Sequence, residues 1–187
     1  MLRGRREERR DERQQERATF GRGGNATRYQ MRQRLVSIGD DFNIVNERGE
    51  RAFHVNGKAL RLRDTLIFED PQGHELCKIQ ERVARIKDSM EIEGPHGERL
   101  AMVKKALITP VRERWTVQVG AGPDLEIQGN ILDHEYEMEA AGHKVAEVSK
   151  KWFRVADSYG VEIAPGQNDV VILAATVAID MMAHPGR

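Results

Sequence analysis

The chain has 187 residues, of which 39% are hydrophobic and 32% are charged, a size and composition that fit one globular domain or at most two. Thirty lysines and arginines balance thirty acidic residues, so the whole chain has no net charge that would attract nucleic acid or a membrane. The single cysteine, Cys77, excludes an internal disulfide bond and a cysteine-based metal cluster. It favours a reducing, cytoplasmic location.

The first 28 residues are rich in arginine. They contain nine arginines and five acids, and no large apolar residue occurs between positions 4 and 17. We predict a solvated tail or frayed helix over residues 1–28, followed by a single domain over residues 29–187. No apolar stretch follows the first basic residues, so no secretory signal is predicted. Such a tail can dock a protein partner, but its interspersed acids argue against nucleic-acid binding.

A repeat built around glycine begins after residue 28. Each copy has a short run of alternating apolar residues, a turn with glycine and a second alternating run, which is the pattern of a β-hairpin. The five turn glycines are Gly49, Gly73, Gly97, Gly122 and Gly142. With two further runs at 29–38 and 158–164, the sequence predicts about twelve antiparallel strands in a meander. No helix intervenes, which excludes βαβ folds.

The last segment breaks the strand pattern. Residues 168–183 are predicted to form a helix that begins at Asn168 or Asp169 and ends before Pro185. The helix is apolar around most of its circumference, so it must be surrounded by protein or by lipid. It is shorter than the roughly 20 residues of a membrane span, and we expect no transmembrane segment. We therefore predict a mainly β fold, a closed antiparallel barrel of about twelve strands that encloses this helix.

Three stretches resemble the LURP-one-related family of the tubby-like superfamily. They are AEVSKKWF at 146–153, DSYGVEI at 157–163 and GKALRLRD at 57–64. The resemblance covers about residues 29–183 and implies a twelve-stranded barrel around a hydrophobic C-terminal helix. The superfamily includes phosphoinositide-binding tubby domains, and phospholipid scramblases share the fold, so the resemblance also implies lipid association. Neither an acidic calcium-binding run like that of scramblases nor a tubby lipid-site motif is found.

Charge is distributed unevenly between the predicted hairpin tips and the connectors that join the hairpins. The tips, at 46–51, 69–75, 93–99, 120–126 and 139–144, hold four cations and ten acids. The connectors, at 57–64, 81–88, 104–114, 130–133 and 149–157, hold thirteen cations and six acids. In a meander the tips lie at one end of the barrel and the connectors at the other, which predicts an acidic rim and a basic rim.

The basic rim is the predicted site for an anionic ligand or a phospholipid head group. Its candidate residues are Arg61, Arg63, Lys87, Lys104, Lys105, Lys150, Lys151, Trp152 and Arg154. Cations attract anionic head groups, and an aromatic side chain beside them can enter the membrane interface. Alternatively, Trp152 and Phe153 close the barrel as core residues, and the charged connectors only keep the protein soluble.

Other chemistry is not indicated by the sequence. No catalytic or nucleotide-binding motif is found, so neither an enzyme nor a cofactor is predicted. His74, His96 and His143 adjoin hairpin glycines, but their spacing is not that of metal ligands, and no metal site is predicted. Cys77 shares the strand parity of core residues. Asp180, within the apolar helix, is expected near the barrel mouth, bonded to strand backbone or to an arginine.

These observations predict a non-enzymatic cytoplasmic barrel, peripheral to the membrane surface, that binds an anionic ligand through its basic rim. A protein-interaction or scaffold module is the main alternative. A scramblase-like membrane protein that uses its C-terminal helix as a span is the third.

Overall fold

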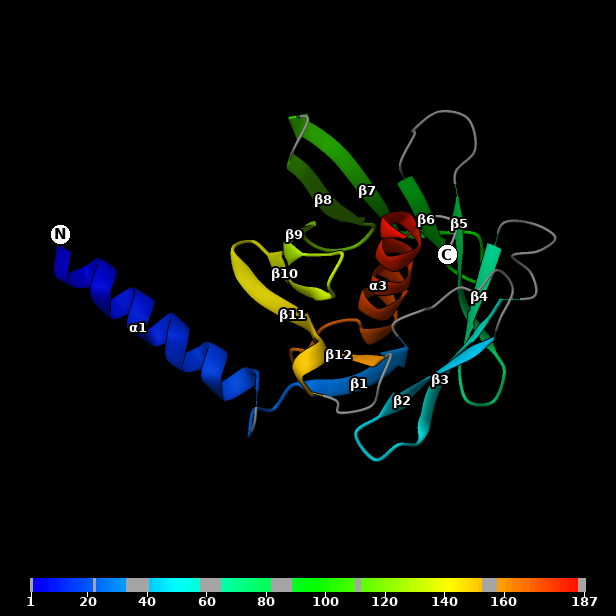
Figure 1. Ribbon diagram of the computed structural model, residues 1–187, viewed down its shortest axis with the longest axis horizontal. Coiled ribbons are helices and arrows are strands. Elements are labelled where there is room, and N and C mark those ends of the chain that lie inside the picture. The colour runs from blue at the N-terminus through cyan, green and yellow to red at the C-terminus, as the bar shows by residue number, and fades with distance from the viewer. Residues whose placement is uncertain are drawn as a thin grey trace.

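The structure is a computed structural model that describes residues 2–21, 23–32, 41–57, 65–81, 89–109, 112–152 and 158–184. Within these residues twelve strands form one closed antiparallel barrel around the C-terminal helix (Figure 1). The strands are β1 Thr27–Arg32, β2 Phe42–Asn46, β3 Arg51–Asn56, β4 Thr65–Glu69, β5 Glu75–Glu81, β6 Ser89–Glu93, β7 Arg99–Thr109, β8 Arg112–Val119, β9 Leu125–Asn130, β10 Glu135–Ala140, β11 His143–Ser149 and β12 Ser158–Ile163. Each strand pairs with its neighbours in sequence, and β1 pairs with β12 to close the ring. The predicted fold class is confirmed.

Alternation of side chains along the strands creates the core. Ile44, Val55, Phe68 and Ile79 point inward and have no exposed surface, as expected when successive residues face opposite sides of a sheet. Cys77 is also fully buried, as its strand parity predicted, and burial raises the pKa of its thiol to about 12. The hairpins turn at glycines that need a positive φ, such as Gly73 with a φ of +87°.

Helix α3, Asp169–Ala183, lies inside the ring of strands (Figure 1). The side-chain oxygen of Asn168 caps it by accepting a hydrogen bond from the backbone N–H of Val171 at 3.2 Å. The hydroxyl of Tyr29 donates to Oδ2 of Asp169 at 2.6 Å, which ties the start of the helix to β1. The ten residues from 171 to 180 are all buried, so the barrel wall covers the whole circumference of the helix. No helix in the described part of the chain combines the length and hydropathy needed to cross a membrane.

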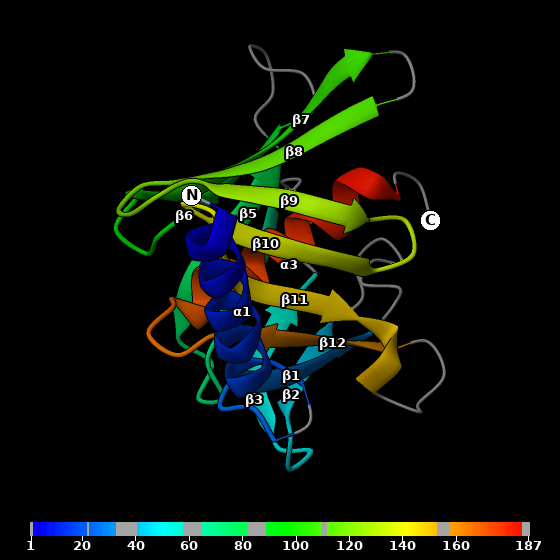
Figure 2. The ribbon, with the colours of Figure 1, turned by 90° about the vertical axis from the view of Figure 1, so that its left-hand side faces the viewer.

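Strands β7 and β8 are longer than expected. The sequence indicated a connector over residues 104–114, which is wrong, because β7 continues to Thr109 and β8 begins at Arg112. Their pairing extends from Ala101 with Val119 to Thr109 with Arg112, and Figure 2 shows the two strands reaching beyond their neighbours. The charged residues of this segment resemble a loop in sequence, but they lie on a hairpin arm.

The N-terminal segment forms helix α1, Leu2–Thr19, which points away from the barrel (Figure 1). Phe20, directly after the helix, is buried. The backbone N–H of Gly21 donates to Oε2 of Glu162 on β12 at 2.8 Å, and the guanidinium of Arg28 pairs with the same carboxylate. Glu162 has no exposed surface. Gly21 and Arg28 therefore attach the segment before β1 to the outside of the barrel at β12.

Candidate functional site

Strand order defines two ends of the barrel. The hairpin tips lie at one end, and the strand ends that lead into the connectors lie at the other, which we call the connector end. Helix α3 starts at the tip end, because it follows β12 after a short turn, and it finishes at the connector end. The last turn of α3 therefore lies at the same end as the predicted basic rim.

Glu135, the first residue of β10, organises part of the connector end. Its carboxylate accepts hydrogen bonds from the Ser149 hydroxyl at 2.9 Å and from the Lys150 backbone N–H at 3.0 Å. It also pairs with Nζ of Lys151 at 3.0 Å. These contacts hold the short 3₁₀ helix η1, Lys150–Trp152, against the end of the barrel. Burial alone would raise the pKa of Glu135, but the hydrogen bonds from Lys151, Lys150 and Ser149 outweigh it and lower the pKa.

Replacing Glu135 with glutamine is expected to lower the free energy of unfolding by about 1–2 kcal/mol at neutral pH, because charge-assisted hydrogen bonds are lost. A carboxyl group whose pKa is lowered by folding stabilises the fold above its unfolded pKa, and this contribution is lost as pH falls through the folded pKa. The variant should therefore lose less stability on acidification than the unmodified protein. Urea unfolding at neutral and at acid pH measures this difference. Glu126→Gln, on an exposed side chain, is the control, and an equal acid-induced loss in Glu135→Gln and the unmodified protein would contradict the assignment.

Lys104 and Lys105, two of the predicted rim residues, point to opposite sides of strand β7. Nζ of Lys105 lies 5.3 Å from the centre of the Trp115 ring, which belongs to the buried core. Lys105 therefore faces the inner side of the wall, and Lys104, its neighbour on the strand, faces the outer side. Lys150 and Lys151 are adjacent on η1, and the Lys151 side chain is 79% exposed. Lys104 and Lys150 form no ion pair with another described residue.

Five predicted rim residues remain, which are Arg61, Arg63, Lys87, Trp152 and Arg154. Arg61, Arg63, Lys87 and Arg154 lie outside the described residues. Trp152 is partly exposed and is not among the hydrophobic residues that pack against the described core.

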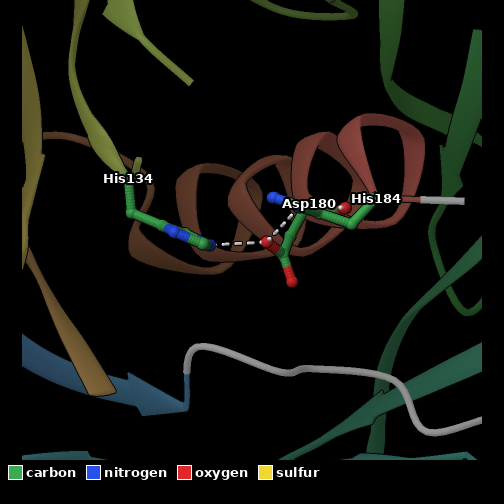
Figure 3. A group of neighbouring side chains, drawn as sticks. All are labelled: His134, Asp180 and His184. Atoms are coloured by element: carbon green, nitrogen blue, oxygen red, sulfur yellow. Dashed lines mark hydrogen bonds and ion pairs between the residues drawn. The ribbon is translucent and has the colours of Figure 1, made fainter. Parts of the chain in front are cut away.

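A second group of polar side chains lies at the connector end, around Asp180 of α3. Nε2 of His134 is 2.6 Å from Oδ1 of Asp180, and Nδ1 of His184 is 3.2 Å from the same oxygen (Figure 3). The side chains of His134 and Asp180 are 3% and 7% exposed, and that of His184 is 19% exposed. The expectation that Asp180 bonds strand backbone or an arginine is wrong, since the described partners of its carboxylate are two histidines. The hydrogen bond with His134 compensates for burying the carboxylate. Nδ1 of His184 also lies 3.2 Å from the backbone carbonyl oxygen of Asp180.

His134 is held by aromatic stacking. It ends the turn between β9 and β10, with a φ of +55°. Its ring stacks on Tyr159 with a centroid distance of 4.4 Å and on His184 with a centroid distance of 5.4 Å. Nδ1 of His134 and the hydroxyl of Tyr159 are both buried, and neither has a hydrogen-bond partner in the described structure.

Two tyrosines complete the surroundings of Asp180. Burial, and next the negative charge of Asp180, raise the pKa of Tyr159 well above its ordinary value. The same two causes raise the pKa of Tyr136, although its hydrogen bond with Thr176 acts in the opposite direction. Both hydroxyls therefore stay protonated at physiological pH.

The three hairpin histidines do not take part in this cluster. His74, His96 and His143 are exposed. Among the described residues, His134, Asp180 and His184 form the one group of three histidine, cysteine or acidic side chains close enough together to hold a metal ion. Sequence reasoning missed both histidines of the group. The signal available was the i, i+4 spacing of Asp180 and His184, which places two side chains on one helix face.

Comparisons with known proteins agree with the barrel. A family model described as LURP-one-related matches residues 27–180. The chain is 26% identical over 154 residues to the uncharacterized protein YxjI of Bacillus subtilis, an alignment that covers 82% of this chain and 92% of that protein. An X-ray structure of a protein from Arabidopsis thaliana matches with a TM-score of 0.62 at 18% identity, covering 83% of this chain and 90% of that one. The likeness to the Arabidopsis structure is one of fold.

Proposed function

This chain belongs to the LURP-one-related family, and from the charge distribution of its barrel we propose that it is a non-enzymatic binding protein for an anionic ligand, most simply the head groups of an anionic phospholipid surface. The contact surface is the connector end. The protein would then be cytoplasmic and attach peripherally to the membrane.

The observation that carries the proposal is the separation of charge between the two barrel ends. The twelve-stranded meander puts every hairpin tip at one end, where ten acids outnumber four cations. The segments taken as connectors in the sequence contain thirteen cations and six acids. Residues 104–109 and 112–114 lie on β7 and β8 and not in a loop. They are still at the connector end, because the acidic tips at 93–99 and 120–126 lie at the opposite ends of these two strands. An anionic surface is attracted to one end of such a molecule and repelled by the other.

The geometry of η1 supports this orientation. Lys150 and Lys151 follow each other on η1, and the partly exposed Trp152 comes next. Glu135 holds the backbone of this segment and pairs with Nζ of Lys151, so the two lysines and the indole lie within one short, fixed turn. A cationic pair beside a partly exposed aromatic residue suits the head-group region of a membrane.

Neutralising three lysines tests the proposal. The triple variant Lys104→Gln, Lys150→Gln and Lys151→Gln should reduce partitioning onto anionic vesicles by about 100-fold, because each lysine near the surface contributes about 1 kcal/mol. Flotation of the full chain with phosphatidylcholine vesicles, with and without phosphatidylserine, measures this at low and at physiological salt. Binding should require the anionic lipid and weaken with salt.

The matched control removes the same number of charges from the acidic end, with Arg48→Gln, Arg51→Gln and Arg99→Gln. It should bind anionic vesicles at least as well as the unmodified protein. Equal binding by the lysine variant, or salt-independent binding to neutral vesicles, would refute the connector end as the contact surface. Binding of a soluble phosphate ester without vesicle binding would assign the site to a free anionic ligand.

A protein-interaction module is the second candidate, favoured by one observation. Helix α1 projects away from the barrel (Figure 1), and its side chains from residue 11 to residue 18 are exposed. Deleting residues 2–19 separates the two functions, because it should leave vesicle binding through the connector end unchanged. A loss of vesicle binding on this deletion would move the contact surface to α1.

A further inference from the structure

We propose that His134, Asp180 and His184 bind one divalent transition-metal ion of the zinc class at the connector end of the barrel. This inference goes beyond the proposed function and does not depend on membrane binding. It rests on the geometry of the three side chains, on the chemistry of their donor atoms and on a buried hydroxyl beside them.

The three donor atoms already lie close to a coordination geometry. Nε2 of His134, an oxygen of Asp180 and Nδ1 of His184 are all within 4.8 Å of one another. In a tetrahedral zinc site with bonds of about 2.0–2.1 Å, neighbouring ligand atoms are about 3.3 Å apart. Asp180 and His184, at 3.2 Å, meet this value. His134 and Asp180, at 2.6 Å, are joined by a hydrogen bond, and a metal ion in place of its proton requires a small opening of the pair.

The donor set selects a class of metal. Two imidazole nitrogens and one carboxylate oxygen are ligands that zinc prefers, and cobalt(II) accepts the same set. Calcium and magnesium prefer oxygen ligands alone, and copper(I) prefers sulfur. Three protein ligands leave one position of a tetrahedral site for water or another small ligand.

The surroundings favour a cation. Asp180 lies in the last turn of α3, where the backbone carbonyls carry the partial negative charge of the helix dipole. Its carboxylate is buried. A divalent ion placed between this carboxylate and the two imidazoles would neutralise charge in a region that has little contact with solvent.

The second observation is the pair of unpartnered atoms. Nδ1 of His134 and the hydroxyl of Tyr159 are fully buried without a hydrogen bond to any described residue, although buried polar atoms in proteins almost always have a partner. Their rings stack on each other, so both atoms border the same cluster. A water ligand on a bound ion is the kind of group that gives the Tyr159 hydroxyl a partner. Nδ1 of His134 points away from an ion bound at Nε2 of the same ring, so its partner would be a group other than the ion and its ligands.

A bound metal would also join two distant parts of the chain. His134 comes from the turn between β9 and β10, whereas Asp180 and His184 come from the end of α3. Coordination would therefore hold the end of the helix to the barrel wall. Because the ligands come together only in the folded chain, metal binding should raise the melting temperature.

Metal titration of the full chain tests the proposal. The protein, without an affinity tag and stripped with a chelator that is then removed, is titrated with cobalt(II) and followed by visible absorption. We expect one ion per chain, an absorption band typical of four- or five-coordinate cobalt, and its loss when zinc is added. Calorimetry with zinc should give the same stoichiometry.

His184→Ala is the main variant, because this side chain is partly exposed and its loss should leave the fold intact. Removing a residue that only supports a metal ligand weakens metal binding by about 10-fold to 100-fold. His184 is itself a proposed ligand, so its loss should weaken zinc binding by at least this much. Asp180→Asn, which keeps the size of the buried side chain, should do the same. His96→Ala, at an exposed hairpin histidine, is the control and should bind zinc like the unmodified protein. Circular dichroism checks that each variant is folded.

Two outcomes would overturn the proposal. One is the absence of a stoichiometric site in the unmodified protein. The other is zinc binding of equal strength in folded His184→Ala and Asp180→Asn, which would place the ion elsewhere.

Discussion

Replacing Arg28 with methionine is expected to lower the free energy of unfolding by about 3–5 kcal/mol, because it leaves a buried carboxylate without its cation. Glu162 has no exposed surface, and its described partners are the Arg28 guanidinium and the backbone N–H of Gly21. One neutral hydrogen bond cannot replace a guanidinium as compensation for a buried charge. Urea unfolding followed by circular dichroism measures the difference.

A double variant distinguishes the loss of a cation from the loss of packing. Arg28→Met with Glu162→Met removes both charges and keeps the apolar contacts, so it should recover most of the stability lost in Arg28→Met. Arg48→Met, at an exposed tip residue, should change stability by less than about 0.5 kcal/mol. If the single and double variants are equally destabilised, the effect does not come from the unpaired carboxylate.

Truncating Leu173 to alanine should cost about 2–5 kcal/mol of unfolding free energy. Leu173 is fully buried on α3, inside the barrel. Removing its branched end deletes apolar contacts and leaves a cavity that a closed wall of strands cannot easily collapse to fill. Thermal and urea unfolding of the full chain measure this loss.

Leu132 provides a control of the same residue type. It lies in the turn between β9 and β10 and is 64% exposed, so Leu132→Ala should stay within about 0.5 kcal/mol of the unmodified protein. A loss below about 1 kcal/mol in Leu173→Ala would mean that the helix is not packed on all sides, because fully buried leucines do not show so small an effect.

The strands were predictable because each hairpin carries two local signals. Alternation with a period of two identifies the strands, and a glycine suited to a positive φ identifies the turn. Gly73 and Gly97 show this in the structure, with φ angles of +87° and +81°. The length of the β7–β8 hairpin was not predictable in this way. The β6–β7 pairing ends at Lys104 and the arm reaches past the neighbouring strands (Figure 2), so the apolar alternation that marks a buried face is lost from Lys105 onward.

The histidine cluster could not be found from local patterns. Asp180 stands out in sequence as a carboxylate in an apolar helix, but its partner His134 lies 46 residues away in a turn. The two meet because α3 runs through the barrel and ends beside that turn. Such a contact depends on the direction in which the helix is threaded, which strand periodicity does not specify.

The seam between β1 and β12 has a consequence for how the chain folds. Thr27 pairs with Ile163, so the ring cannot close until nearly all of its strands have been synthesised. The hairpins are local and can form early, whereas the seam carries a high entropic cost of loop closure. The helix that fills the interior follows the last strand, and a ring closed before its arrival would leave the inward-facing apolar side chains of the strands without the helix they pack against. Closure of the ring and docking of the helix are therefore expected to occur together, as one late and cooperative event.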